Sequence, residues 1–112
     1  MDIYSVSEVG QPDGSSLVEV AKFPMGQLVW TCGVNDLVAD STDFAKFVAN
    51  SLKRHLAGDW GDLDAEDCRV NDDALKHGDR LFSAYEHDGL PKIWIITEWD
   101  RSVTTVLFPS EY

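Results

Sequence analysis

The last third of the chain constrains the fold most, because three strand-like segments lie there with very little chain between them. Their β-branched and aromatic content is typical of strands, and they cover residues 80–86, 92–98 and 103–108. Asp88 and Gly89 form a hairpin signal between the first two. Short connections make consecutive strands antiparallel neighbours, so we expect an antiparallel three-stranded meander.

Two helices are expected upstream of this meander. The first begins at Ser41-Thr42-Asp43, where hydroxyl caps precede an acid, and ends before Gly58. Its apolar residues recur at steps of three and four and form one stripe: Phe44, Phe47, Val48, Leu52, His55 and Leu56. The second covers residues 65–77, with Asp64 as its cap and Gly78 at its end. It is mostly polar, with a thin apolar face.

The N-terminal residues predict a hairpin that precedes the main domain. Residues 2–9 and 16–23 alternate weakly, and a turn signal, Gln11-Pro12-Asp13-Gly14, lies between them. We therefore divide the chain into an extension, residues 1–24, and a single domain, residues 25–112, in which residues 35–40 form one helical turn. The expected fold class is α+β: an antiparallel sheet, made from the meander and the N-terminal hairpin, with two helices packed on one face.

The charge of the chain limits its partners. The 20 acidic residues outnumber the nine Lys and Arg residues, which gives a net charge of −11. Such a chain repels phosphate, so we expect no extended nucleic-acid binding; it attracts basic protein surfaces instead.

Two distant cysteines, Cys32 and Cys68, predict reduced thiols. The N-terminus has no signal-peptide pattern and no apolar run has membrane-spanning length, so we expect a cytoplasmic protein without membrane contact.

Metal and cofactor motifs are not recognisable in the sequence. His55, His77 and His87 are too scattered for a zinc site. The acidic segment 62–73 resembles a calcium loop, but Asp67 stands where the sharp turn needs glycine, and Asp73 replaces the bidentate glutamate. We therefore predict neither a metal ion nor a cofactor.

The strongest candidate for a binding surface is the acidic segment from Asp59 to Asp73, which holds seven acids and one base, Arg69. Carboxylates on a helix face and its flanking loop can imitate the repeating charge of duplex phosphates. The predicted binding residues are Asp59, Trp60, Asp62, Asp64, Glu66, Asp67, Asp72 and Asp73. The partner would be the basic surface of a nuclease or defence complex. The simpler interpretation is an ordinary solvated helix face.

An enzymatic alternative uses His55 as a general acid or base. Arg80 or Arg101 would hold a phosphate, as in a small metal-independent ribonuclease or toxin-like domain. Hydroxyls would complete the ring around this anionic ligand, from Ser83, Tyr85, Thr97, Thr104 and Thr105. The competing interpretation of His55 is a hydrogen-bonded cation at the end of a helix. A third reading is a structural or accessory module in which Trp60 and Trp99 contact a partner.

From about Gly26 to Tyr112 the chain resembles a family of small uncharacterised bacterial proteins associated with plasmids and other mobile elements. The resemblance rests on Arg54-His55 with the GDWG segment at 58–61, on residues 71–75, on RLFSAY at 80–85 and on residues 93–112. Several similar proteins are labelled as restriction-enzyme subunits. The resemblance implies a bacterial, mobile-element context, in which an inhibitor of host nucleic-acid defence, of the DNA-mimic type, is an expected function.

Overall fold

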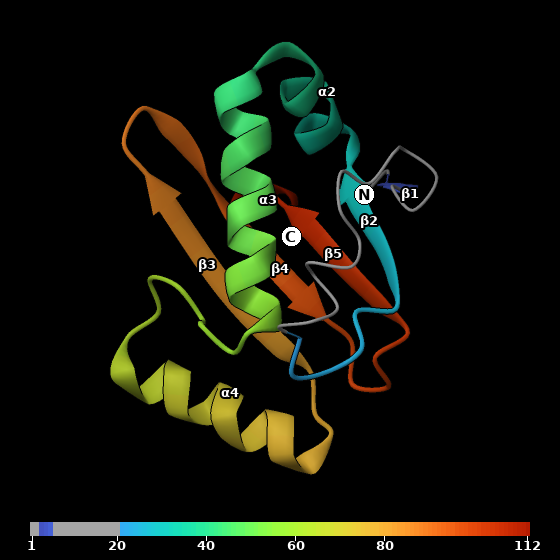
Figure 1. Ribbon diagram of the computed structural model, residues 1–112, viewed down its shortest axis with the longest axis vertical. Coiled ribbons are helices and arrows are strands. Elements are labelled where there is room, and N and C mark those ends of the chain that lie inside the picture. Colours follow the sequence, from blue (N-terminus) through green and yellow to red (C-terminus); the bar gives the residue numbers. More distant parts are fainter. Residues whose placement is uncertain (1–2, 6–20) are drawn as a thin grey trace.

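The computed structural model describes residues 3–5 and 21–112, which form an α+β fold. A five-stranded sheet has the order β1-β2-β5-β4-β3, and three α-helices accompany it in the described ranges (Figure 1). The elements are β1 (Ile3–Ser5), β2 (Gln27–Thr31), α2 (Cys32–Asp40), α3 (Thr42–Leu56), α4 (Ala65–His77), β3 (Leu81–His87), β4 (Leu90–Thr97), β5 (Val103–Leu107) and the 3-10 helix η1 (Pro109–Glu111). None of the described helices is long and apolar enough to cross a membrane.

The C-terminal meander is confirmed. β3 pairs antiparallel with β4, with Ser83 opposite Ile95, and β4 pairs antiparallel with β5, with Thr97 opposite Thr104. The tight turns Asp88-Gly89 and 98–102 make each strand of the meander pair with the next one along the chain.

The expectation of a purely antiparallel sheet is wrong. β2 lies beside β5 and runs parallel to it, with Trp30 opposite Val106, so the sheet is mixed. The reason is a long crossover: the chain leaves β2 through the helices and the β3–β4 hairpin before it returns as β5. Leu28 and Val29 are both buried although their side chains point to opposite faces, which is typical of a central strand.

The expected N-terminal hairpin takes a different form. β1 pairs antiparallel with β2, with Ile3 opposite Thr31, so the partner of this strand lies at residues 27–31. Residues 6–20, and with them most of the second predicted strand at 16–23, lie outside the described residues, and residues 21–23 are not a strand. Phe23 belongs to the buried core, so residues on both sides of position 24 share one core.

The predicted first helix is confirmed as α3. The Ser41 hydroxyl accepts a hydrogen bond from the Phe44 amide at 3.1 Å, and Gly58, with φ of +81°, follows the last turn. All six residues of the predicted apolar stripe are buried. Apart from His55 they join the apolar core cluster, together with Ile93, Ile95 and Val106 from the sheet. The stripe therefore places α3 on the sheet.

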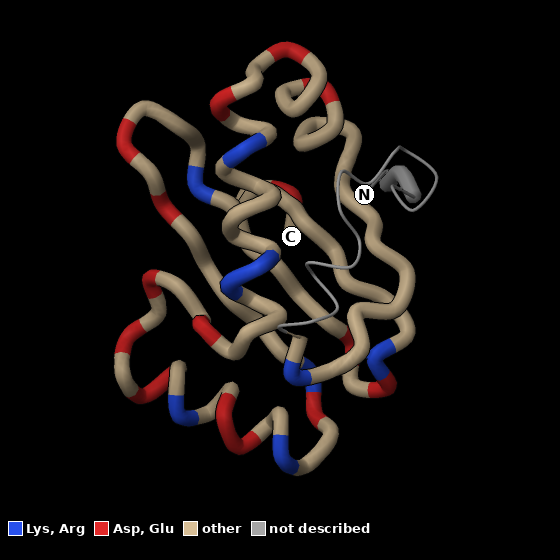
Figure 2. Tube along the Cα trace, viewed as in Figure 1, with Lys and Arg blue, Asp and Glu red and all other residues tan. Residues whose placement is uncertain are grey.

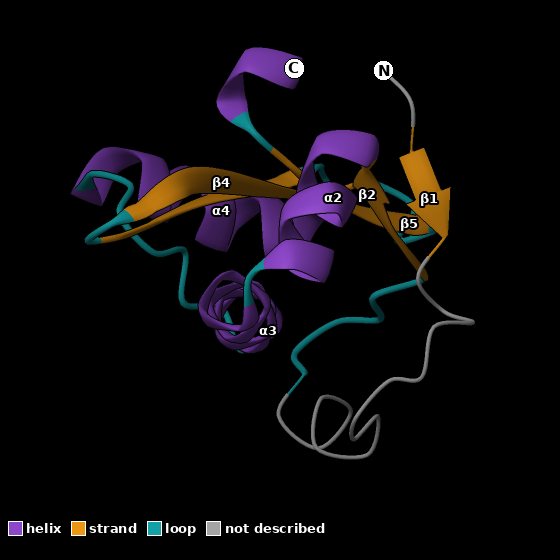
Figure 3. Cartoon of the chain, turned by 90° about the horizontal axis from the view of Figure 1, so that it is seen from above, coloured by secondary structure: helices purple, strands orange, loops and turns teal. Residues whose placement is uncertain are grey.

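The arrangement of the helices differs from the prediction. Residues 35–40 belong to the nine-residue helix α2, whose N-terminus is capped by the Thr31 hydroxyl. Figure 3 shows α2 and α3 on the same side of the sheet, while η1 rises from the opposite side. α4, expected beside α3 on that face, instead packs against β3, the edge strand (Figure 1). A helix with so thin an apolar face cannot cover a sheet face, but it can close an edge.

Candidate functional site

The loop that precedes α4 pairs with the outer edge of β3. The Ala84 amide donates to the Trp60 carbonyl at 3.4 Å, and the Ala84 carbonyl accepts from the Asp62 amide at 2.7 Å. The Asp62 carboxylate then accepts a hydrogen bond from the Glu86 amide at 2.7 Å. Gly61 allows this close approach, because a Cβ there would lie 2.1 Å from the Ala84 carbonyl oxygen. The loop is therefore fixed to the sheet as if it were a short strand.

α4 closes the remainder of the same edge. The side-chain amide of Asn71 donates to the Phe82 carbonyl and accepts from the Phe82 amide at 3.0 Å. The Trp60 indole donates to the Asp72 carboxylate at 2.9 Å and ties the loop to the helix. The backbone N–H and C=O groups of alternate β3 residues point away from β4. They find partners in α4 and its loop, which prevents edge-to-edge association of the sheet.

Exposed carboxylates line this part of the molecule, which we call the acidic edge. It comprises Asp59, Asp62, Asp64, Glu66, Asp67, Asp72, Asp73, Glu86 and Asp88, all of them exposed. Figure 2 shows that acidic positions follow one another from the β3–β4 turn along β3 to α4. All seven acids of the predicted binding segment belong to it, and β3 and its turn add Glu86 and Asp88, which the sequence analysis missed.

Four of the predicted acids also maintain the fold. Asp59 forms a salt bridge with Arg54 at 2.7 Å, and the Arg54 guanidinium holds the pKa of this carboxyl below its usual value. Asp64 caps α4 by accepting from the Asp67 amide at 2.8 Å. Asp62 and Asp72 accept the hydrogen bonds from Glu86 and Trp60 described above. Reversing the charge of any of these four would therefore disturb both the surface and the fold.

The remaining predicted acids, Glu66, Asp67 and Asp73, project from α4 into solvent. In the described part of the chain only three ion pairs form, Arg54–Asp59, Arg80–Glu98 and Lys92–Glu86, and none involves these three side chains. Their charge is therefore available to a partner. Val70 lies on the same helix and is 60% exposed, an apolar contact point among the carboxylates.

The two tryptophans considered as anchors have opposite environments. Trp60 is only 3% exposed and packs near Phe23 and His55 in the core, so its ring cannot contact a partner. Trp99, in the turn between β4 and β5, is 66% exposed.

His55 lies at the centre of a buried polar chain. Its Nε2 is 2.9 Å from the Thr97 hydroxyl, and its Nδ1 contacts the Ser83 hydroxyl. Thr97 is hydrogen-bonded to Thr104 at 2.7 Å, and the Thr104 hydroxyl donates to the Met25 carbonyl at 2.7 Å. Because Thr104 gives its proton to Met25, Thr97 must donate to Thr104 and accept from the imidazole. This direction assigns the proton of a neutral His55 to Nε2 and makes Ser83 the donor to Nδ1.

Burial keeps His55 neutral. The side chain is fully buried, and desolvation, assisted by the positive charge of Arg101, lowers its pKa from 6.5 to about 3. Among the described residues every buried side-chain nitrogen and oxygen has a hydrogen-bond partner, and both ring nitrogens of His55 are included, so the imidazole needs no ligand to be stable here.

Of the residues in the enzymatic alternative, Ser83 and Thr97 contact His55, and Thr104 continues the same polar chain. Arg101 lies over the Phe23 ring that packs against the imidazole. Tyr85 donates to the Asp59 carbonyl instead, and Arg80 and Thr105 do not contact His55. Arg80 binds the Tyr112 hydroxyl at 2.9 Å and is 3.9 Å from Glu98. Arg101, in the left-handed conformation with φ of +60°, donates to the carbonyls of Asp79 and Glu98. Thr105 pairs with Ile96 and therefore points to the face opposite Thr97 and Thr104.

The described residues contain no group of three or more His, Cys, Asp or Glu side chains that could hold a metal ion. Comparison of the chain with protein-family models, with curated proteins and with solved structures finds no match. Function is therefore inferred from the geometry and charge of the molecule.

Proposed function

We propose that this protein is a small, acidic, non-enzymatic binding protein whose acidic edge docks on a basic groove that a nucleic-acid enzyme normally uses for DNA or RNA. The observation that carries the proposal is the set of exposed carboxylates without ion-pair partners on α4, a helix fixed to the edge of the sheet by Asn71, Trp60 and Asp62.

Rigidity of this edge supports a binding role. A surface that is already ordered loses little conformational entropy when a partner docks. The loop is paired with β3 through Ala84, and α4 is capped at both ends, by Asp64 and by Gly78. The carboxylates therefore occupy defined positions before any partner arrives.

The spacing of the outward carboxylates also supports the proposal. Glu66 and Asp73 are seven residues apart, which is about 10 Å along the axis of an α-helix. Three phosphate steps along one strand of duplex DNA cover about the same axial distance. A basic groove with cations placed for phosphates would meet carboxylates at comparable intervals.

Two observations favour binding over catalysis. The imidazole of His55, the best candidate for proton transfer, is enclosed by Ser83, Thr97, Phe23 and Trp60 and has no exposed atom for a substrate to reach. Arg80 and Arg101 are engaged in contacts of their own. The resemblance to mobile-element proteins adds the expected setting: the bacterial cytoplasm, and a host restriction or CRISPR-type complex as the partner.

The experiment is affinity capture from a bacterial lysate at low salt, followed by elution with duplex DNA. We expect a basic nucleic-acid-binding protein that DNA displaces, because both ligands would compete for one groove. Elution by an equal ionic strength of simple salt is the control for nonspecific attraction. The proposal would be contradicted if DNA displaced none of the captured proteins more effectively than salt does.

A further inference from the structure

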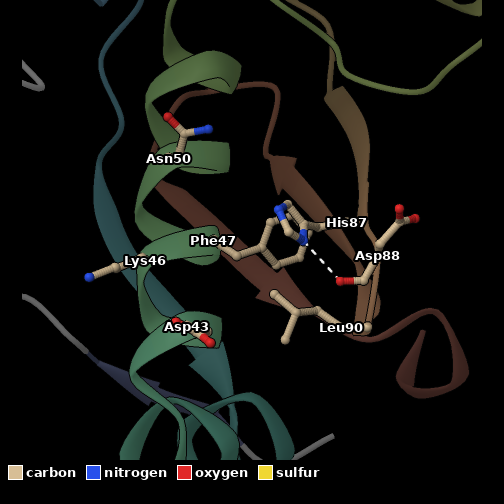
Figure 4. A pocket seen from close by; sticks show the side chains of 8 residues that line it. Asp43, Lys46, Phe47, Asn50, His87, Asp88 and Leu90 are labelled. Carbon is tan, nitrogen blue, oxygen red and sulfur yellow. Dashed lines mark hydrogen bonds between the residues drawn. The ribbon is translucent and has the colours of Figure 1, made fainter.

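A groove of about 610 Å³ lies between α3 and the turn that joins β3 to β4 (Figure 4). Phe47 and Leu90 form its apolar part, and the imidazole of His87 packs against the Phe47 ring with the ring centroids 5.9 Å apart. Asp43, on the helix, and Asp88, in the turn, border the groove, and in Figure 4 the Asp88 carboxylate points away from the His87 ring. An aromatic floor bordered by two acidic residues suits a cation with an apolar stem.

Both carboxylates are free to receive a cation. Neither Asp43 nor Asp88 forms one of the three ion pairs in the described residues. Lys46 also borders the groove, but Figure 4 shows its side chain extending from α3 away from His87. The ring of His87 is held in place by a hydrogen bond between Nδ1 and the Asp88 carbonyl at 3.1 Å.

The groove is also continuous with the acidic edge, because Asp88 is its last member and lies two residues beyond Glu86. A partner that covers α4 and β3 would therefore reach the turn at residues 88–89, which borders the groove, with the same surface.

We infer that this groove receives one arginine side chain of the partner protein, an inference that rests on the proposed function. The alkyl stem lies against Phe47 and Leu90, the planar guanidinium stacks on the His87 ring, Asp43 accepts its hydrogen bonds, and Asp88 adds negative charge from the turn. Arginine fits better than lysine, because a planar cation can stack on a ring and bind a carboxylate through two N–H groups at once. The groove thus adds a specific contact to a surface that otherwise recognises charge alone.

The test uses a small probe, so that it does not depend on finding the partner. Nα-acetyl-arginine amide is titrated into the ¹⁵N-labelled protein at low salt, and chemical shifts are followed by NMR. Nα-acetyl-citrulline amide, a neutral molecule of nearly the same shape, is the control ligand. We expect saturable shifts at the amides of residues 87–90 and at the side-chain amide of Asn50 with arginine, and binding at least about tenfold weaker with citrulline.

Two double variants with the same change in net charge complete the test. D43N/D88N should weaken arginine binding about tenfold, whereas D36N/D79N, at exposed positions outside both the groove and the acidic edge, should leave it within about twofold. Equal affinity for citrulline, shifts that avoid the groove, or equal losses in the two variants would overturn the inference. If the probe fails while the α4 carboxylates still control partner capture, only the arginine site is wrong. If the probe binds and capture does not depend on α4, the proposed function is wrong.

Discussion

Asn71 satisfies both backbone groups of Phe82: its side-chain amide donates to the carbonyl and accepts from the amide of this edge-strand residue. A side chain that imitates a neighbouring strand joins α4 to a sheet it otherwise contacts through few apolar residues. Asn71, which is 5% exposed, is therefore the polar residue that binds the acidic helix directly to the edge strand.

Replacement of Asn71 by leucine should lower the free energy of unfolding by about 2 to 3 kcal/mol, because both Phe82 groups lose their partner in a buried place. Urea denaturation measures this change, and hydrogen exchange at the Phe82 amide should accelerate. D73N, a change on the outer side of the same helix, should stay within about 0.5 kcal/mol. Equal stability of the two variants would show that Asn71 does not hold α4.

The buried histidine predicts a specific dependence of stability on pH. In the folded state its pKa lies at about 3, against 6.5 for an exposed histidine, so the unfolded chain binds one more proton between these values. Stability should therefore fall as the pH decreases from about 6.5 toward 3, at up to about 1.4 kcal/mol per pH unit from this group alone.

H55Q tests this account, because glutamine keeps hydrogen-bonding capacity and does not titrate. The variant should be less stable than the wild type at neutral pH and should lose less stability on acidification. Urea midpoints measured between pH 7 and 4 give both curves. Parallel curves would mean that folding does not lower the pKa of His55.

The acids that maintain the fold should be separable from those that only carry charge. D64A removes the cap of α4 and should cost about 1 kcal/mol of stability, since the Asp67 amide loses its acceptor. D67A, three residues further on, removes the same charge from a side chain that is exposed and has no hydrogen-bond partner among the described residues, and should cost less than about 0.5 kcal/mol. Thermal unfolding compares the two variants. A greater loss of stability in D67A than in D64A would contradict the distinction between acids that maintain the fold and acids that only carry charge.

Trp99 should account for most of the tryptophan fluorescence that acrylamide can quench, because it is 66% exposed whereas Trp60 is 3% exposed. W99F should therefore leave an emission that is quenched much less, while W60F should leave the quenching constant at least as high as in the wild type. A neutral quencher is needed, since the net charge of −11 would bias an ionic one. If acrylamide quenched W99F as strongly as the wild type, the Trp99 ring of the wild type would have to be buried.

Local patterns in the sequence predicted the elements whose causes are local. The stripe on α3, the caps at Ser41 and Asp64 and the antiparallel meander all depend on residues close together in the chain. The parallel pairing of β2 with β5 joins positions more than 70 residues apart, and Leu28-Val29-Trp30 was too short a run to reveal it. The same limit applies to β1, whose partner depends on the whole topology.

Only part of the candidate site could be predicted, because the rest depends on contacts between residues far apart in the sequence. The density of acids between Asp59 and Asp73 is visible in the sequence, but the second role of Asp59, Asp62, Asp64 and Asp72 depends on where β3 and Trp60 lie. The burial of His55 likewise depends on Ser83 and Thr97, which follow it by 28 and 42 residues. An asparagine on the apolar face of α4 was the available signal for the edge contact.

The most direct test of the central claim is the affinity of the captured partner for two double variants, measured by calorimetry over a range of salt concentrations. E66K/D73K reverses two outward charges on α4, and D36K/D40K makes the same change on α2, away from the acidic edge. We predict that the α4 variant binds at least about tenfold more weakly and that the α2 variant stays within about threefold of the wild type. Equal affinities of the two variants at low salt would contradict the claim that the acidic edge is the binding surface.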